Sequence, residues 1–203
     1  MSITIYIIII TVAVSLISFS RTDIFSKLTF SPYEISHRRQ YWRFFSCALL
    51  HGDFFHLFIN MFVLYSFGLA VERYYSFIFG NASTIIFLLL YISSVGAANV
   101  FSYYKHQNNS SFISVGASGA VSAIVFVSIL FDPYRPLYLY GLIGIPGILL
   151  GIGYLIYSYY MSNKGTDNID HNAHLYGAIY GMLFTIVFKP SLFLAFVFKL
   201  LGN

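Results

Sequence analysis

The chain alternates between long apolar runs and shorter polar segments, and this pattern predicts a bundle of membrane-spanning helices. A helix needs about 20 predominantly apolar residues to cross the hydrocarbon core of a bilayer. Six runs are close to that length, whereas a seventh, at 192–201, is too short to cross and is expected to lie on the surface. The six predicted spans cover residues 3–19, 51–71, 82–104, 115–131, 137–160 and 171–188.

The polar segments set the boundaries of these predicted helices. The longest, residues 20–50, combines five Lys and Arg residues with Trp and Tyr, a mixture typical of the headgroup layer. Residues 132–136 contain two prolines and are expected to form a turn, because proline cannot continue a helix. Five glycines and a proline between residues 141 and 153 loosen the fifth predicted span. We interpret the first run as a retained helix rather than a signal peptide, and residues 1–203 as one all-α membrane domain.

Composition supports a polytopic membrane protein and excludes several other classes. Of the 203 residues, 58% are hydrophobic and only 9% are charged, against about 25% charged residues in a soluble domain. Aromatic residues make up 20% of the chain, and many lie near the ends of the spans, where a bilayer has its interfaces. The net charge of +4 is too small and too scattered to indicate nucleic-acid binding. The single cysteine, Cys47, excludes an internal disulfide framework.

The fourth run begins with a serine set among small residues. Gly116 and Gly119 flank Ser118 and leave the backbone around its hydroxyl open to close approach. Gly119 and Ala123 place small residues at i and i+4, which allows a second helix to pack closely. A serine at the start of a helix also lies among unsatisfied N–H donors that favour negative charge. This environment suits a serine nucleophile whose attack leaves an oxyanion, although an ordinary helix N-cap with a packing motif would have the same sequence.

The second run contains polar side chains in a segment that is otherwise apolar. His56 and Asn60 are four residues apart and therefore lie on one face of a helix. Both side chains carry N–H donors that can point at a shared oxygen. Hydrogen bonds that merely join neighbouring helices are the alternative interpretation. His51, nearer the end of the span, is expected to be structural.

The sixth run offers a candidate base for the serine. His174, Gly177 and Gly181 lie at i, i+3 and i+7 on one face, and the glycines allow another helix to approach closely. If that partner is the face of the fourth run with Gly119 and Ala123, His174 reaches Ser118. A neutral imidazole within hydrogen-bonding distance of a serine is the minimal general-base pair for acyl transfer.

The neighbours of His174 have other expected roles, and a metal site is the competing interpretation of the histidines. His171, beside Asp170, is expected to be solvated. His171 and His174 have the spacing to share an ion, with His56 as a third ligand. However, the chain has no His-Glu-x-x-His pattern and no carboxylate that would complete a hydrolytic zinc site within a span. We therefore expect no metal and no cofactor.

Taken together, these stretches resemble the rhomboid family of intramembrane serine proteases. Each motif alone is weak, but their order and spacing over about residues 41–188 are specific. The matching segments are Trp42-Arg43, His51 with His56 and Asn60, Gly116-Ala117-Ser118-Gly119, and Ala173-His174 with Gly177 and Gly181.

The resemblance implies a six-transmembrane-helix rhomboid-like bundle that works as a serine endopeptidase with a Ser–His dyad. Ser118 would be the nucleophile and His174 the base, while His56, Asn60 and the Ser118 backbone N–H would form the oxyanion hole. The family's substrates are transmembrane helices of other proteins, which enter sideways past the fifth helix. We expect a multi-pass protein of a bacterial plasma membrane, with a eukaryotic organelle as the alternative, and the family implies that both termini lie in the cytoplasm.

The chain departs from the family pattern at one position near the nucleophile. Many members carry a tyrosine four residues after the serine that packs on the catalytic imidazole, whereas this chain has Ser122. The resemblance therefore does not identify the residue that holds the ring of His174, and we expect that Asp170 does not.

Two other classes of function remain as alternatives to the protease. An inactive relative that binds membrane-protein helices would usually lack the serine or the histidine, and this chain has both. A transporter would be expected to have a charged or repeat-related site at the midplane, and the sequence shows neither.

Overall fold

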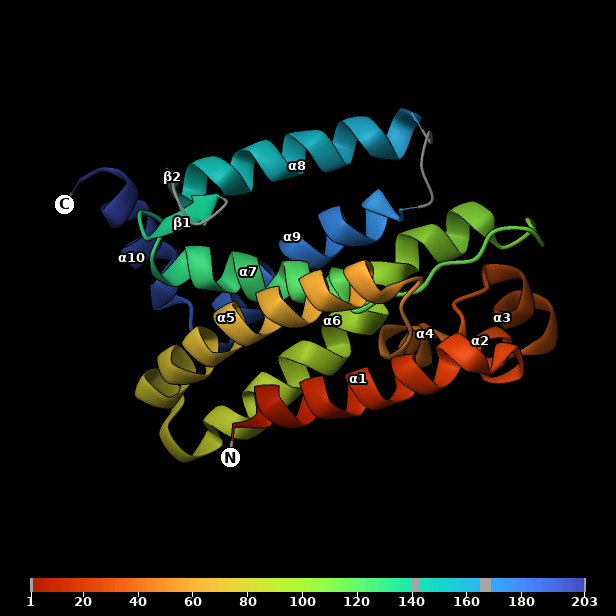
Figure 1. Cartoon of the computed structure of the whole chain (residues 1–203). Helices are drawn as coiled ribbons and strands as arrows, with labels where there is room; N and C mark the ends of the chain where they lie inside the picture. Colours follow the sequence, from red (N-terminus) through yellow and green to blue (C-terminus); the bar gives the residue numbers. More distant parts are fainter. Residues whose placement is uncertain (1, 140–142, 165–168, 203) are drawn as a thin grey trace.

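The computed structural model describes residues 2–139, 143–164 and 169–202, and it is predominantly helical (Figure 1). Two 3₁₀ turns, η1 Cys47–Leu49 and η2 Gly80–Ala82, and a hairpin of β1 Pro136–Leu139 with β2 Ile143–Pro146 accompany the helices. The helices are α1 Ile3–Ser20, α2 Thr22–Leu28, α3 Pro32–Arg38, α4 Arg43–Ser46, α5 Phe54–Phe79, α6 Ser83–His106, α7 Ser118–Phe131, α8 Gly147–Lys164, α9 His171–Phe188 and α10 Ser191–Leu200.

Helix α7 is the centre of the bundle. It packs against α5, α6 and α9, and almost all of its side chains are buried. A helix that is apolar on every face is suited to this position, since no face of it has to meet water. At 14 residues it is about 21 Å long, which is shorter than the hydrocarbon core of about 30 Å.

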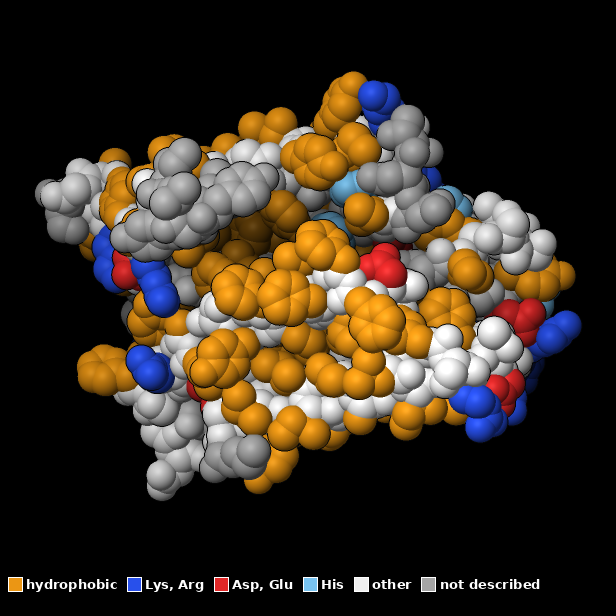
Figure 2. All heavy atoms as spheres, viewed as in Figure 1, with side chains coloured by type: hydrophobic (Ala, Val, Ile, Leu, Met, Phe, Trp, Pro, Cys, Tyr) orange, Lys and Arg blue, Asp and Glu red, His pale blue; other side chains and the backbone are white. Residues whose placement is uncertain are grey.

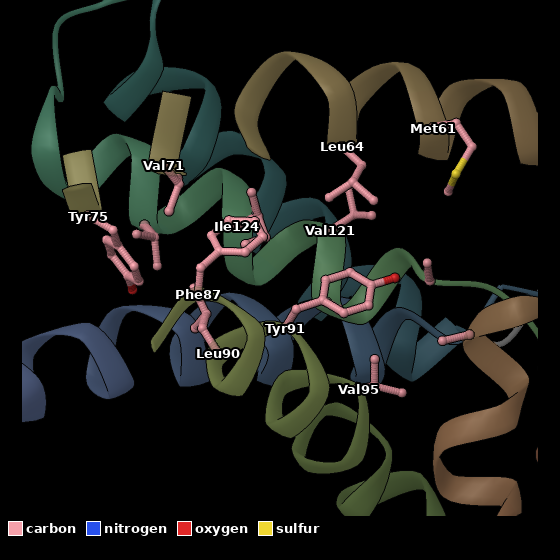
Figure 3. Close-up of a cluster of buried hydrophobic side chains, with 14 of the residues drawn as sticks. Met61, Leu64, Val71, Tyr75, Phe87, Leu90, Tyr91, Val95, Val121 and Ile124 are labelled. Atoms are coloured by element: carbon pink, nitrogen blue, oxygen red, sulfur yellow. The ribbon is translucent and has the colours of Figure 1, made fainter. Parts of the chain in front are cut away.

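The hydrophobic core lies where α5, α6 and α7 meet. Figure 3 shows side chains from the three helices converging, with Leu64 and Tyr75 from α5, Tyr91 from α6, and Val121 and Ile124 from α7. The Tyr75 hydroxyl also hydrogen-bonds the Thr185 hydroxyl of α9 at 2.6 Å, so a buried polar pair joins α9 to this core.

The second predicted span was placed too early and ended too soon. Helix α5 begins after Asp53, whose carboxylate accepts a hydrogen bond from the His56 N–H at 2.7 Å as an N-cap. It continues past Glu72, beyond the predicted end at residue 71. The Glu72 carboxylate instead accepts hydrogen bonds from the Ser2 hydroxyl at 2.6 Å and the Thr4 N–H at 2.7 Å. It therefore provides an acceptor for a backbone N–H in the first turn of α1 that has no partner within the helix.

The fifth predicted span, 137–160, is wrong at residues 137–139 and 143–146. Strands β1 and β2 pair there in an antiparallel hairpin, and α8 begins only at Gly147 and ends at Lys164. Pro146 explains the boundary, because proline has no N–H for a helix and holds the preceding residue in an extended conformation. The expected loosening at Gly141 lies outside the described residues.

The polar connection between α1 and α5 is folded around Arg43. The buried guanidinium donates hydrogen bonds to the carbonyls of Ser26 and Thr29 at 2.8 and 2.7 Å, and to the Gln40 side chain at 2.6 Å. Burial lowers the pKa of Arg43, but an arginine remains protonated even so. These bonds fix the short helices α2 and α4 relative to one another.

This connection is also joined to the segment that leads into α7. Phe30 and Ser114 form an isolated antiparallel bridge, with N–H to carbonyl distances of 3.0 Å in both directions. The Gly116 N–H donates to the Cys47 carbonyl, also at 3.0 Å. The backbone just before Ser118 is therefore held from outside by the connection, and this sets where α7 begins.

Apolar helices make the chain an integral membrane protein. Among the described residues, Ile3–Ser20 and the 53-residue stretch Phe54–His106, which contains α5 and α6, are long and apolar enough to cross a membrane. Helices α9 and α10 would count as a third crossing if taken together, although they meet at a bend of 119°.

Candidate active site

Ser118 and His174 meet where α7 and α9 begin. Ser118 is the first residue of α7, and His174 lies in the first turn of α9. The His174 Nε2 atom and the Ser118 Oγ atom are 2.7 Å apart, a short hydrogen bond. Both side chains are half-buried. The predicted contact between a serine and an imidazole from distant parts of the sequence is therefore present.

Close contact between the backbones of α7 and α9 brings the two residues together. A methyl group added at Gly177 would collide with the Gly119 carbonyl, and one added at Gly181 would lie 2.6 Å from the Ala123 carbonyl oxygen. Only glycine allows this approach, so the four small residues predicted to pack together do face one another. This close packing of α7 and α9 places His174 next to Ser118.

Gly116 places the ring of His56 beside the serine. Its φ of +123° is a conformation that side-chain-bearing residues rarely adopt. A methyl group there would lie 2.9 Å from His56 Cε1, 3.0 Å from His56 Nε2 and 3.7 Å from Ser118 Oγ. The imidazole of His56 and the hydroxyl of Ser118 therefore border the same small volume, which the missing side chain leaves open.

If the chain has the protease activity that the sequence resemblance implies, Gly116→Ala is expected to reduce it at least about tenfold, since the methyl group strains the backbone and pushes His56 away from Ser118. The measurement is the cleavage rate of a single-pass substrate in detergent micelles. Gly80→Ala is the matched control, because Gly80 also has a positive φ of 53° but has nothing within 4 Å. Equal losses in the two variants would assign the effect to backbone strain alone.

The other polar residues of the second predicted span occupy different places. The Asn60 side chain is buried and donates to the His56 carbonyl at 3.0 Å; among the described contacts it has none with Ser118. His51 lies before α5, is fully buried, and its Nδ1 atom is 3.0 Å from the Ser15 hydroxyl of α1. His51 thus joins α1 to the start of α5, in agreement with the expected structural role.

The hydrogen bonding of His56 indicates which ring nitrogen carries its proton. The Gly52 N–H donates to His56 Nδ1 at 3.5 Å, so Nδ1 is the acceptor. In a neutral ring the hydrogen is then on Nε2, the atom that lies next to Gly116. His56 is therefore arranged to donate a hydrogen bond into the volume beside Ser118.

The residues that precede His174 were only partly predicted. The Asp170 carboxylate caps α9 by accepting from the Ala173 N–H at 3.1 Å, and it also accepts from the Ser102 hydroxyl at 2.8 Å. His171, expected to be solvated, is in fact buried at 3% exposure because its ring packs edge-on between Tyr157 and His174.

Tyr154 of α8 is a site residue that the sequence analysis missed. Its ring is stacked on the His174 ring, with centroids 6.0 Å apart and an interplanar angle of 19°. Its hydroxyl lies 2.8 Å from the Ser122 hydroxyl. No spacing within the glycine-rich run points to this tyrosine, because the contact depends on how α8 lies across α7 and α9.

A hollow marks the surface of the molecule between two of its helices. Figure 2 shows a depression between α8 and α5 that is lined with hydrophobic side chains, with histidine side chains visible toward one end. Both helices carry exposed apolar residues, among them Phe58 and Phe62 of α5 and Ile152 and Ile156 of α8. No group of three His, Cys, Asp or Glu residues that could hold a metal occurs within the part of the chain that the structure describes.

The fold and site define a helical integral membrane protein in which a serine and an imidazole meet at the end of a central short helix. The Rhomboid domain family model matches residues 38–191. The chain belongs to the rhomboid family, which confirms the resemblance seen in the sequence.

Similar proteins occur in bacteria and plants. The chain is 30% identical to "Putative rhomboid protease YdcA" of Bacillus subtilis over 148 residues, which cover 73% of this chain and 67% of the relative. It is 28% identical to "Rhomboid protease AarA" of Providencia stuartii over 182 residues, covering 77% and 59% of the two chains. With "RHOMBOID-like protein 12, mitochondrial" of Arabidopsis thaliana it shares 32% over 146 residues, covering 64% of this chain and 41% of the relative. The matched region thus spans about two fifths of that plant protein.

Proposed function

We propose that this protein is an intramembrane serine endopeptidase that cuts transmembrane segments of other membrane proteins. The observation that carries the proposal is the 2.7 Å contact between His174 Nε2 and Ser118 Oγ at the start of a buried helix. The bacterial relatives named as rhomboid proteases support it.

In the first half of the reaction, Ser118 Oγ attacks the carbonyl carbon of the scissile peptide bond while His174 Nε2 takes its proton. The resulting oxyanion is stabilised by nearby N–H donors. His174 then passes the proton to the leaving amine nitrogen, the C–N bond breaks, and an acyl ester remains on Ser118.

In the second half, His174 Nε2 removes a proton from a water molecule, whose oxygen attacks the ester carbon. Collapse of the second tetrahedral intermediate releases the new carboxyl end of the substrate and returns the proton to Ser118. The dyad requires no cofactor and no metal.

The oxyanion donors are assigned to His56, Asn60 and the Ser118 backbone N–H. The first N–H groups of a helix have no partner within the helix, so that of Ser118 is available to an incoming oxygen. The His56 Nε2–H is aimed beside Gly116. Asn60 uses one N–H on the His56 carbonyl, so it both orients His56 and retains a second N–H to donate.

His56→Ala and Asn60→Ala are each expected to lower kcat about a hundredfold with KM changed less than threefold, because the oxyanion exists only in the transition state. The measurement is steady-state cleavage of a fluorogenic transmembrane peptide in micelles. A rise in KM with an unchanged kcat would contradict this role and place the residue in substrate binding.

The depth of the site and the adjacent hollow support a transmembrane substrate. Since α7 is about 9 Å shorter than the hydrocarbon core, Ser118 would lie below one membrane surface if the other end of α7 reaches the opposite surface. The hollow between α5 and α8 would admit a helix from the lipid (Figure 2). We therefore place the scissile bond just inside the membrane boundary.

We further propose a single domain that crosses the membrane six times, through α1, α5, α6, α7, α8 and α9. An even number of crossings puts both termini on one side. The start of α1 and the end of α10 do lie toward the same end of the bundle (Figure 1). We assign that side to the cytoplasm of a bacterial plasma membrane.

A fluorophosphonate probe tests the proposal, because it reacts only with an activated serine. Membranes that contain the intact chain are labelled, and the adduct is located by mass spectrometry. An adduct on Ser118 that is lost after prior denaturation is the expected result. Intact, folded protein that takes up no probe would favour an inactive member of the family that only binds membrane-protein helices.

A further inference from the structure

In the proposed mechanism the imidazole of His174 keeps its Nε2 atom on Ser118, and packing against the face of the ring is one way to hold it there. Two residues close to the dyad do not pack on the ring. The Oδ1 atom of Asp170 accepts hydrogen bonds from the Ala173 N–H and the Ser102 hydroxyl. Ser122, one turn after Ser118, is too short to cover a ring.

Tyr154 has the position and the support to hold the ring. Its stacking on His174, at 6.0 Å between centroids and 19° between planes, is within the favourable range for paired aromatic rings. The Tyr154 ring also contacts Phe126 of α7, with centroids 6.2 Å apart. The tyrosine therefore lies between α7 and α9 and touches side chains of both helices.

The hydroxyl of Tyr154 makes a further contact that helps to keep the ring in that place. It lies 2.8 Å from the Ser122 hydroxyl, which is itself buried at 5% exposure on α7. A larger residue at position 122 would occupy the space that the Tyr154 hydroxyl fills. The Tyr154 ring of α8 is thus anchored to α7 through the hydrogen bond between its hydroxyl and the Ser122 hydroxyl.

We propose that Tyr154, anchored by Ser122, is the positioning residue that holds the His174 imidazole in line with Ser118. The role follows from the stack and the hydroxyl pair, and its catalytic consequence rests on the proposed protease function. Tyr154 itself does not touch the reacting atoms.

Kinetics of three variants test the inference. Tyr154→Ala is expected to lower kcat about tenfold with KM within twofold of the intact chain, because the dyad loses alignment while the substrate site remains. Tyr154→Phe keeps the ring and is expected to retain at least about a third of kcat, as is Ser122→Ala. Tyr159→Ala, which removes a tyrosine from the same helix at a side chain 63% exposed, is the matched control and is expected to be neutral.

A spectroscopic readout decides the inference even if the chain does not cleave. In protein with ¹³C-labelled histidine, the Cε1–H resonance of His174, identified with His174→Gln, is expected to carry a ring-current shift from the Tyr154 ring. The shift is expected to disappear in Tyr154→Ala and to persist in Tyr154→Phe and Tyr159→Ala. A resonance unmoved in Tyr154→Ala would overturn the inference.

The two readouts separate the possible failures. An intact chain that shows the shift but neither cleaves nor takes up a fluorophosphonate would overturn the protease and leave the positioning role standing. An active chain in which Tyr154→Ala keeps full kcat would overturn the positioning role alone. Equal losses in Tyr154→Phe and Tyr154→Ala would also overturn it, since they would assign the effect to the hydroxyl rather than to the ring.

Discussion

Replacing Ser118 with alanine is expected to abolish cleavage of a single-pass substrate, and replacing His174 with alanine is expected to have the same effect. The serine supplies the attacking oxygen, and the imidazole supplies the only base within hydrogen-bonding distance among the described contacts of that oxygen. A nucleophile and its base act as one unit, so either loss should lower the rate by on the order of 10⁴-fold or more.

The double variant provides the sharper measurement. Because Ser118 and His174 act together, removing both should cost no more than removing one, in contrast to independent residues, whose effects multiply. Cleavage is followed by immunoblot after co-expression with the substrate. His37→Ala, which removes an exposed histidine of α3 in the connection, is the matched control. Cleavage that persists in Ser118→Ala would exclude this residue as the nucleophile.

Gly177→Ala is the second substitution with a large expected effect, and it acts through packing. The added methyl group would overlap the Gly119 carbonyl, which is backbone and cannot rotate away. The helices α7 and α9 must separate, so we expect a loss of stability of about 3 kcal/mol and activity below a tenth of that of the intact chain. Thermal unfolding in micelles and the cleavage rate measure the two effects.

Gly153 provides a matched control for the Gly177→Ala substitution. Gly153→Ala adds the same methyl group in α8, where nothing lies within 4 Å. Alanine favours a helix over glycine by about 0.5–1 kcal/mol, so this variant should be neutral or slightly more stable. If both variants lost stability equally, the contact between α7 and α9 would not be the reason.

The sequence predicted the bounds of a helix correctly where the length of its apolar run alone sets them. The bounds of α1, α6 and α9 differ from the predicted spans by two residues or fewer at each end. The prediction failed where local chemistry overrode hydropathy. Pro146 delays the start of α8, and Asp53 caps α5 later than the apolar run suggested. The folding of the connection around Arg43 depends on carbonyls that no sequence pattern reveals.

The part of the site that depends on close packing of two helices could be predicted, because small residues at helical spacing indicate such packing. Glycine and alanine at helical spacing pointed to the meeting of α7 and α9, and hence to the pair of Ser118 and His174. Tyr154 could not be found in this way, because a tyrosine at the edge of a glycine-rich run has the same appearance as any residue facing lipid. Its partners on α7 and α9 become visible only once the helices are placed.

The enclosure of α7 separates the position of Ser118 from the thickness of the bilayer. Helices on the periphery must match the thickness of the surrounding lipid and respond to a mismatch by tilting. A central helix of 14 residues, wrapped by protein, is exempt from that constraint. The bridge between Phe30 and Ser114 holds the segment just before α7 against the folded connection between α1 and α5. If the chain is the proposed protease, the peptide bond that it cuts should therefore stay the same in thin and thick lipid mixtures.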